Sequence, residues 1–202
     1  MKNARILSAG LAILLLVAAG WAAYEKWGGG ESISAPSGPG GLSEELLKGP
    51  MAVFEIWPEP RPLPQDMVFE SADGPVRLAD FRGRVLLVNL WATWCAPCIE
   101  ELPTLDGLQS EFGGPDFRVL PISLDRAPVE TAQAALETFG VSHLRTIADR
   151  KMAAMGGLGI TGLPTTLLVD RQGREIGRYV GPADWSSPEA AALVRAAIKG
   201  GA

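Results

Sequence analysis

The strongest constraint on the fold is a seven-residue apolar run that leads directly to the only two cysteines of the chain. This run, Val85–Trp91, is continuous, which is typical of a strand buried on both faces of a sheet. From Cys98 onward, apolar residues recur at helical spacing as far as Phe112. Cys95 and Cys98 therefore stand at a strand-to-helix junction, and this arrangement predicts an α/β fold.

The rest of the chain also alternates strand and helix patterns. Strand patterns cover 68–70, 76–78, 117–124, 146–148, 165–170 and 175–180, and helix patterns cover 128–139, 151–155 and 187–199. Together with the buried strand and the helix that follows it, these patterns alternate strand and helix along most of the chain. We therefore predict an α/β sandwich built on a mixed sheet.

An uncharged 18-residue run of apolar and small residues covers 6–23. A membrane-spanning helix needs about 20 such residues. Positive charge before the run favours a cytoplasmic N-terminus with the remainder outside, and a cleaved secretory signal is the alternative. We expect residues 1–5 to be a cytoplasmic tail, 6–23 a transmembrane anchor or signal segment, 24–61 a flexible Gly/Pro/Ser-rich linker and 62–202 the folded domain. Four prolines within 57–64 indicate extended chain packed on that domain.

Composition excludes several classes of function. The formal net charge of -5 leaves no basic excess, so we expect no nucleic-acid partner. Two cysteines and one histidine are too few for a disulfide-dense scaffold or a Cys/His zinc site. Two thiolates alone are able to hold Cu(I), but the only histidine, His143, is distant and has no acidic or thiol neighbour along the chain. We predict no metal site and no functional role for His143.

The position of the cysteine pair favours a redox-active disulfide. Cys95 is expected at a helix N-terminus, where free backbone N–H groups and the helix dipole favour a thiolate. Cys98, one turn further, is expected to be more buried and less acidic. Cys95 would then attack a substrate disulfide and Cys98 would resolve the mixed disulfide, while Pro97 stiffens the first turn. An inert structural disulfide is the alternative, but so small a ring constrains little of the unfolded chain.

The segment WATWCAPC, from Trp91 to Cys98, resembles the W-A-x-W-C-x-P-C signature of thioredoxin-like proteins. Pro103 falls where that family kinks its first long helix, and GLPT at 162–165 matches the loop that carries its cis-proline, here Pro164. The resemblance covers about 62–198 and implies a thioredoxin-like sandwich. LADFRGR at 78–84 and the glutamate of C-x-x-E-L-P, Glu101, resemble the membrane-anchored TlpA/ResA type, and GPADW at 181–185 is most similar to TlpA.

This resemblance implies an exported thiol:disulfide oxidoreductase whose redox group is the disulfide itself, with no other cofactor. Members of the ResA type serve haem attachment to apocytochrome c, and members of the TlpA type serve copper-centre formation in cytochrome oxidase. The expected partners are disulfides of exported cytochrome assembly factors or apocytochromes and a membrane electron donor of the CcdA/DsbD type. The expected location is the bacterial inner membrane, with the thioredoxin-like domain in the periplasm. A periplasmic dithiol oxidant and a Cu(I)-binding cytochrome oxidase assembly factor are the alternatives.

The resemblance also assigns roles to neighbours of the cysteines. Asn89 takes the place of the buried aspartate of thioredoxins and is unable to ionise near neutral pH. Glu101 occupies the glutamate position of the ResA type. Our hypothesis is that it lies partly buried beside Cys98, has a raised pKa and relays the proton of that thiol; a solvated surface carboxylate, as expected for Glu100, is the alternative. Trp91 and Pro103 are expected to support the site, and the residues expected to contact substrate are Trp94, Ala96, Pro97, Leu163 and Pro164.

Overall fold

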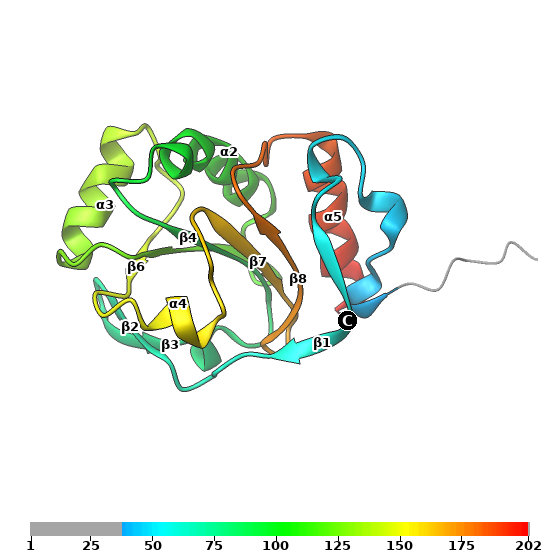
Figure 1. Cartoon of the computed structure of the whole chain (residues 1–202), viewed down its shortest axis with the longest axis horizontal. Helices are drawn as coiled ribbons and strands as arrows, with labels where there is room; N and C mark the ends of the chain where they lie inside the picture. The colour runs from blue at the N-terminus through cyan, green and yellow to red at the C-terminus, as the bar shows by residue number, and fades with distance from the viewer. Residues whose placement is uncertain (1–37, 202) are drawn as a thin grey trace, which may run out of the picture. The chain divides into compact units, whose positions relative to one another are not determined.

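The computed structural model describes residues 38–201, and its centre is an eight-stranded mixed sheet (Figure 1). The strand order is β1-β8-β7-β4-β5-β6-β2-β3. The strands are β1 (Glu55–Pro62), β2 (Val68–Ser71), β3 (Gly74–Arg77), β4 (Val85–Trp91), β5 (Phe117–Ser123), β6 (Ile147–Ala148), β7 (Thr165–Val169) and β8 (Arg174–Val180). The helices are α2 (Ala96–Phe112), α3 (Val129–Thr138), α4 (Ala153–Gly157) and α5 (Pro188–Gly200), with 3-10 turns η1 (Pro39–Gly41), η2 (Glu44–Leu46), η3 (Gly49–Met51) and η4 (Leu78–Phe81).

The elements predicted around the cysteines are confirmed. Strand β4 has the predicted bounds and all seven of its residues are buried. It pairs in parallel with β5 and antiparallel with β7, so the sheet is mixed as predicted. The last helix begins as its sequence indicates, because the Ser187 hydroxyl accepts a hydrogen bond from the Ala190 amide at 3.3 Å. The chain therefore has the thioredoxin-like α/β fold that the resemblance implies.

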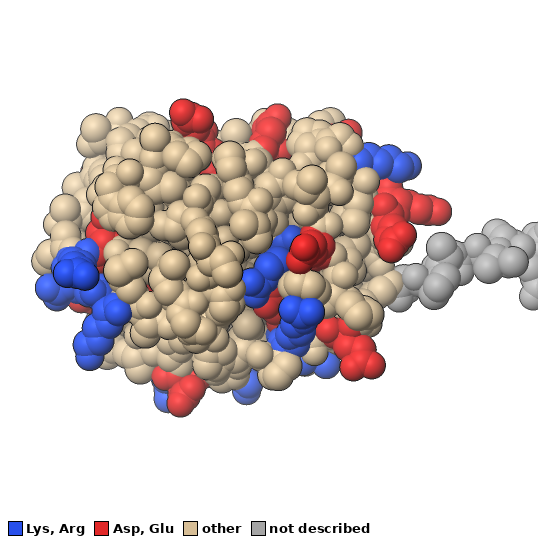
Figure 2. Space-filling view, viewed as in Figure 1, with Lys and Arg blue, Asp and Glu red and all other residues tan. Residues whose placement is uncertain are grey.

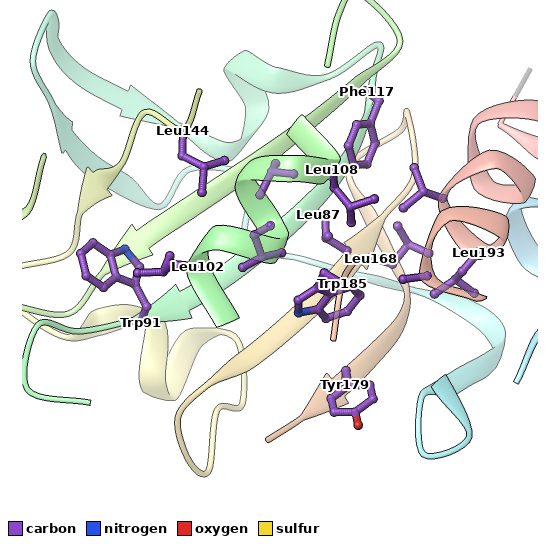
Figure 3. Close-up of a cluster of buried hydrophobic side chains, with 14 of the residues drawn as sticks. Leu87, Trp91, Leu102, Leu108, Phe117, Leu144, Leu168, Tyr179, Trp185 and Leu193 are labelled. Carbon is purple, nitrogen blue, oxygen red and sulfur yellow. The ribbon is translucent and has the colours of Figure 1, made fainter. Parts of the chain in front are cut away.

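Strand β4 sends its side chains alternately into two separate cores, as the two-residue period of a strand requires. Leu87 and Trp91 belong to a cluster that α2, α3 and α5 complete (Figure 3). Leu86, Val88 and Leu90 pack on the opposite face with apolar residues from η4 and α4. Each large apolar side chain buried in this way contributes about 1.5–3 kcal/mol. Because β4 is packed on both faces, the position of its last residue is fixed, and so is the position of Cys95 just after it.

The segment before the sheet differs from its prediction. A flexible linker was expected over 24–61, and over the described residues 38–61 that prediction is wrong. These residues form η1, η2, η3 and most of β1, which pairs antiparallel with β8. Leu42 and Met51 are fully buried, and all three turns contact α5. The glycines and prolines of this segment indicated a linker, but Leu42 and Met51 among them are buried in the core. Strand β1 agrees with the extended chain expected over 57–64, since prolines are tolerated in an edge strand.

The predicted transmembrane anchor, residues 6–23, lies outside the described part of the chain. Within residues 38–201, no helix combines the length and the apolar character needed to cross a bilayer. On the face shown in Figure 2, acidic and basic side chains are interspersed and form no continuous basic surface.

Candidate active site

The two cysteines form a disulfide at the first turn of α2, with their Cα atoms 5.3 Å apart. Cys95 is the N-cap residue, and its carbonyl accepts the first helical hydrogen bond, from the Ile99 amide at 3.1 Å. Cys95 is 6% exposed and Cys98 is fully buried. The helix position and the order of burial are therefore as predicted. The unpaired N–H groups of this first turn favour a thiolate at Cys95 once the disulfide is reduced.

The register of the sheet brings the Pro164 segment to the same edge as the cysteines, namely the edge formed by the last residues of β4 and the first residue of β7. Thr165, the first residue of β7, pairs with Leu90 near the end of β4. The residue before it, Pro164, is buried and follows Leu163 through a cis peptide bond, as the resemblance implies. Trp94 also lies at this edge and is 65% exposed, so its ring is open to contact from outside. Ala96 is likewise exposed, and Pro97 is half-buried.

A carboxylate at the end of β5 holds the loop between β4 and the cysteines. Asp125 accepts hydrogen bonds from the Thr93 amide at 3.1 Å, the Thr93 hydroxyl at 2.8 Å and the Ser123 hydroxyl at 2.7 Å. Beneath the loop, Trp91 is fully buried as predicted, and its Nε1 donates to the Thr146 hydroxyl at 3.2 Å. The sequence interpretation missed Asp125 and Thr146. For Asp125 the signal was the carboxyl end of β5, the parallel strand next to β4, where α/β sheets collect polar functional groups.

Glu101 is 3% exposed and accepts hydrogen bonds from three directions. The Asn89 side-chain amide donates to Oε1 at 2.8 Å, the Ala183 backbone amide donates to Oε2 at 3.0 Å, and the Trp185 indole donates to Oε2 at 3.3 Å. Burial raises the pKa of Glu101 to about 7, although these three donors oppose the shift. The alternative of a solvated surface carboxylate is thus excluded for Glu101, whereas Glu100 is exposed as predicted.

The surroundings of Asn89 explain why an amide stands at this position. Its Nδ2 atom donates to Glu101 and, at 2.9 Å, to the Thr166 hydroxyl on β7. Glu101 is three residues beyond Cys98, so both lie on neighbouring turns of one face of α2. The arrangement combines an attacking sulfur, a resolving sulfur and a carboxyl group able to exchange a proton near neutral pH. Pro103 lies further along the same helix and is exposed.

The structure gives His143 an acidic neighbour that the sequence analysis did not find. Asp106 on α2 lies 37 residues away in sequence, and its carboxylate is 2.8 Å from Nδ1 of His143. The same carboxylate accepts from the backbone amides of His143 at 2.7 Å and Leu144 at 3.0 Å. The sequence offered no sign of this partner because α2 and the loop after α3 are brought together only by the fold. Asp106 is 11 residues beyond Cys95, toward the other end of the helix.

The described residues also bear on the prediction for metals. Within 38–201, no group of three or more His, Cys, Asp and Glu side chains is arranged to hold a metal ion. The redox group of the site is the disulfide between Cys95 and Cys98.

A mixed sheet whose central strand leads to a CxxC disulfide, with a cis-proline segment at the same edge, defines a thioredoxin-like protein. Residues 62–194 match the Redoxin family model, and the chain belongs to this family. This finding agrees with the similarity to thioredoxin-like proteins that starts near residue 62 in the sequence.

Individual relatives support the same assignment. The chain is 30% identical over 110 residues to the thiol-disulfide oxidoreductase ResA of Geobacillus thermodenitrificans, a match that covers 54% of this chain and 62% of the relative. It is 36% identical over 113 residues to the thiol:disulfide interchange protein HelX of Rhodobacter capsulatus, covering 55% and 61%. The chain thus spans less than two thirds of the length of these curated relatives.

Comparison of structures points the same way. A crystal structure described as a thiol:disulfide interchange protein DsbE from Chlorobium tepidum matches with a TM-score of 0.61 and 25% identity. The match covers 69% of this chain and 98% of that one. These comparisons confirm the resemblance to thioredoxin-like proteins of the ResA/TlpA type.

Proposed function

We propose that this chain is a thiol:disulfide oxidoreductase that reduces disulfides of exported client proteins. The observation that carries the proposal is the Cys95–Cys98 disulfide, which caps α2 at the sheet edge that also presents Trp94 and Pro164. The names of the ResA and HelX relatives support the same reaction class. A purely structural disulfide would not require exposed residues beside it. In addition, a disulfide between residues only three apart in sequence adds little stability.

In the proposed reaction, the reduced protein passes two electrons to its client. The Cys95 thiolate attacks one sulfur of the client disulfide, so that a Cys95–client bond forms, the client S–S bond breaks and the leaving thiolate takes a proton. The Cys98 thiolate then attacks Cys95 Sγ. The mixed disulfide breaks, the second client thiolate leaves and is protonated, and the Cys95–Cys98 disulfide of the present structure forms.

Glu101 manages the proton of the resolving thiol in this scheme. Cys98 is fully buried, and only its thiolate is a competent nucleophile. Burial raises the pKa of Glu101 to about 7, so this carboxyl accepts the Cys98 proton and gives it up again with little free-energy cost near neutral pH. Asn89 holds Oε1 in place and does not titrate.

The client is held by the exposed edge around the disulfide. Trp94 supplies an apolar contact, as aromatic side chains often do at interfaces. Ala96 and Pro97 border the sulfurs, and the backbone before Pro164 contacts the client chain beside its disulfide. These residues set affinity and orientation, while the cysteines perform the exchange.

The proposed location is the periplasmic face of a bacterial inner membrane, with residues 6–23 as a single anchor and the N-terminus in the cytoplasm. The length of the apolar run and the positive charges before it support this arrangement. A bacterial periplasm is kept oxidising, so a reductase there needs a membrane dithiol donor of the CcdA/DsbD type. We assign its clients to cytochrome c assembly or to assembly of the cytochrome oxidase copper centre, as the TlpA/ResA resemblance implies.

Trapping tests this function. In the full chain with Cys98→Ser, Cys95 is expected to retain its client as a stable mixed disulfide that mass spectrometry identifies in native membrane and periplasm fractions. Cys95→Ser is the matched control and should trap nothing. Absence of any captured protein with Cys98→Ser would contradict the reductase function.

Two further measurements distinguish the alternatives. A reduction potential near -120 mV, the value of a strong dithiol oxidant, would favour disulfide formation over reduction. Retention of Cu(I) by the reduced chain against a competing chelator would favour the copper-binding assembly factor. We expect a clearly more negative potential and loss of Cu(I) to the chelator.

A further inference from the structure

The loop between β8 and α5 contacts two parts of the site at once. In this segment, Gly181–Trp185, hereafter the 181–185 loop, the Gly181 amide donates to the Pro164 carbonyl at 2.9 Å. Two and four residues later, at Ala183 and Trp185, the same loop supplies two of the three donors to Glu101, both of them to Oε2. One short connection therefore joins the segment that borders the disulfide to the buried carboxyl group.

The Trp185 side chain is held firmly in this position. It is fully buried and packs edge-to-face on Tyr179, with ring centroids 5.8 Å apart (Figure 3). Its backbone amide donates to the Thr104 hydroxyl at 3.2 Å, and that hydroxyl donates to the Glu101 carbonyl at 2.7 Å. Trp185 thus contacts α2 through both its backbone and its ring. These contacts hold the indole N–H in position to donate to Oε2 of Glu101.

The donors from this loop favour ionisation of Glu101 and oppose the effect of burial. A hydrogen bond from a fixed N–H group favours the charged form of a carboxyl, and it counts for more where water is excluded. The other groups that face Glu101, Asn89 on β4 and Thr166 beyond it on β7, do not titrate. The titratable groups nearby are Tyr179 on β8 and the two cysteines at the start of α2.

We propose that Trp185 is a positioning residue for Glu101, and that the 181–185 loop couples this carboxyl group to the Pro164 segment. The inference rests on the proposed function, in which Glu101 carries a proton during thiol exchange. A client that displaces the Pro164 carbonyl pulls on Gly181 and thereby moves both donors to Oε2. Client contact and proton transfer are then linked through one loop.

The first test replaces the donor and keeps the ring. With Trp185→Phe in the full chain, the side-chain carboxyl of Glu101 is titrated by ¹³C NMR, its signal being assigned by its absence in Glu101→Gln. Loss of one donor to the charged form should raise the titration midpoint by about one pH unit, a tenfold change in the ionisation equilibrium. Trp91→Phe is the matched control, because it removes an equally buried indole that donates to Thr146. An unmoved midpoint in Trp185→Phe would overturn the assignment.

The pH dependence of disulfide reduction provides a readout that a merely structural role would not move. Trp185→Phe should shift the pH–rate profile in the same direction as the NMR midpoint. Combined with Glu101→Gln, it should produce no additional shift, because the group that titrates has been removed. An equal shift in both backgrounds would show that Trp185 does not act through Glu101.

A second variant tests the link to Pro164 and does not depend on the tolerance of the core to Trp185→Phe. Gly181 has a φ of +102°, which L-residues rarely adopt, and a Cβ there would meet no atom within 4 Å. Gly181→Ala therefore disturbs only the backbone of the loop, and it should shift the Glu101 midpoint and raise the KM for a disulfide substrate. Gly140→Ala, at φ +77° in open space after α3, is the matched control and should do neither. Equal behaviour of the two glycine variants would contradict the coupling.

The two levels of the proposal fail separately. If Trp185→Phe leaves the midpoint fixed while Cys98→Ser still traps clients, the positioning role is wrong and the oxidoreductase function stands. If the midpoint moves but the reduced wild-type chain transfers no electrons to disulfides, the function is wrong although Trp185 still positions Glu101.

Discussion

Helix α2 carries two buried carboxyl groups five residues apart, and their surroundings change their pKa values in opposite directions. Glu101 is 3% exposed and Asp106 is 7% exposed. Burial raises the pKa of Glu101 to about 7. Burial also acts upward on Asp106, but hydrogen bonds from the His143 ring and from backbone amides of residues 142–144 outweigh it and lower the pKa of Asp106.

The difference shows that burial alone does not decide what a carboxyl group does. Asp106 meets a loop whose imidazole is half-exposed to water, and it completes two backbone hydrogen bonds there. Glu101 meets only neutral donors, from β4 and from the 181–185 loop, and is shielded from water. One carboxylate therefore stabilises the fold in its charged form, while the other is kept close to the point at which it exchanges a proton.

The largest expected effect concerns thiol exchange. Glu101→Gln should slow disulfide reduction at pH 7 by about 100-fold, at the lower end of the range for loss of a general acid–base group. Asp106→Asn keeps an acceptor for the loop and should leave the rate within about threefold of wild type. Stopped-flow reduction of a disulfide substrate measures both. Equal rate losses in the two variants would show that the distinction between the carboxyls has no catalytic meaning.

The second prediction concerns stability against pH. The folded chain holds a proton on Glu101 up to about pH 7, whereas the unfolded chain loses it near 4.5, the ordinary pKa of a glutamate. The stabilisation that protonated Glu101 gives to the folded chain is therefore fully present below pH 4.5 and is lost as pH rises through 7. This loss lowers the free energy of unfolding by about 3 kcal/mol. Glu101→Gln should remove this slope. Urea unfolding of the oxidised protein between pH 4.5 and 8 measures it, and parallel curves for variant and wild type would contradict the raised pKa.

The third prediction concerns the other carboxyl. Asp106→Ala leaves the amides of His143 and Leu144 without their acceptor, and should lower the free energy of unfolding at pH 7 by about 1–3 kcal/mol. Because the pKa of Asp106 is lowered in the folded chain, its contribution is present above pH 4 and is lost as pH falls further. The variant should thus converge with wild type in acid. A constant difference down to pH 2 would contradict the charged-form stabilisation.

The smallest effect is expected for the imidazole. The His143 side chain is 53% exposed, so its pairing with Asp106 is screened by water and contributes below about 1 kcal/mol. His143→Ala should therefore be mild in urea unfolding and should leave both backbone hydrogen bonds to Asp106 in place. A loss as large as that of Asp106→Ala would show that the ring, rather than the loop backbone, is the main partner of this carboxylate.

The sequence was sufficient for those features in which local pattern and fold agree. The apolar run before the cysteines predicted β4 to the residue, and the start of α2 followed from the same junction. The burial of Glu101 and the cis bond before Pro164 agree with what the family resemblance implied. Two of the three donors to Glu101 were not predictable, because Ala183 and Trp185 lie 82 and 84 residues away in the sequence. No periodicity indicates which loop amide will face a buried oxygen.

In the segment before the sheet, the local sequence pattern predicted a flexible linker where the structure has ordered turns and a strand. Its glycines and prolines are typical of linkers, and only the completed core shows that Leu42 and Met51 have a place to be buried. Similarly, Asp106 and His143 belong to separate elements, and only tertiary packing makes them neighbours. Local sequence describes strands and turns well, but it does not describe which distant surfaces they will cover.

The packing of η1, η2 and η3 against α5 has a consequence for the order of events during synthesis. The first described residues of the domain are buried by α5, which comes much later in the sequence, so the N-terminal part of the core stays open until that helix has been made. Closure over so long a stretch of chain is slow compared with local pairing. A nascent chain with the present topology therefore keeps an exposed apolar surface until α5 emerges, and a surface of this kind is prone to aggregation during that interval.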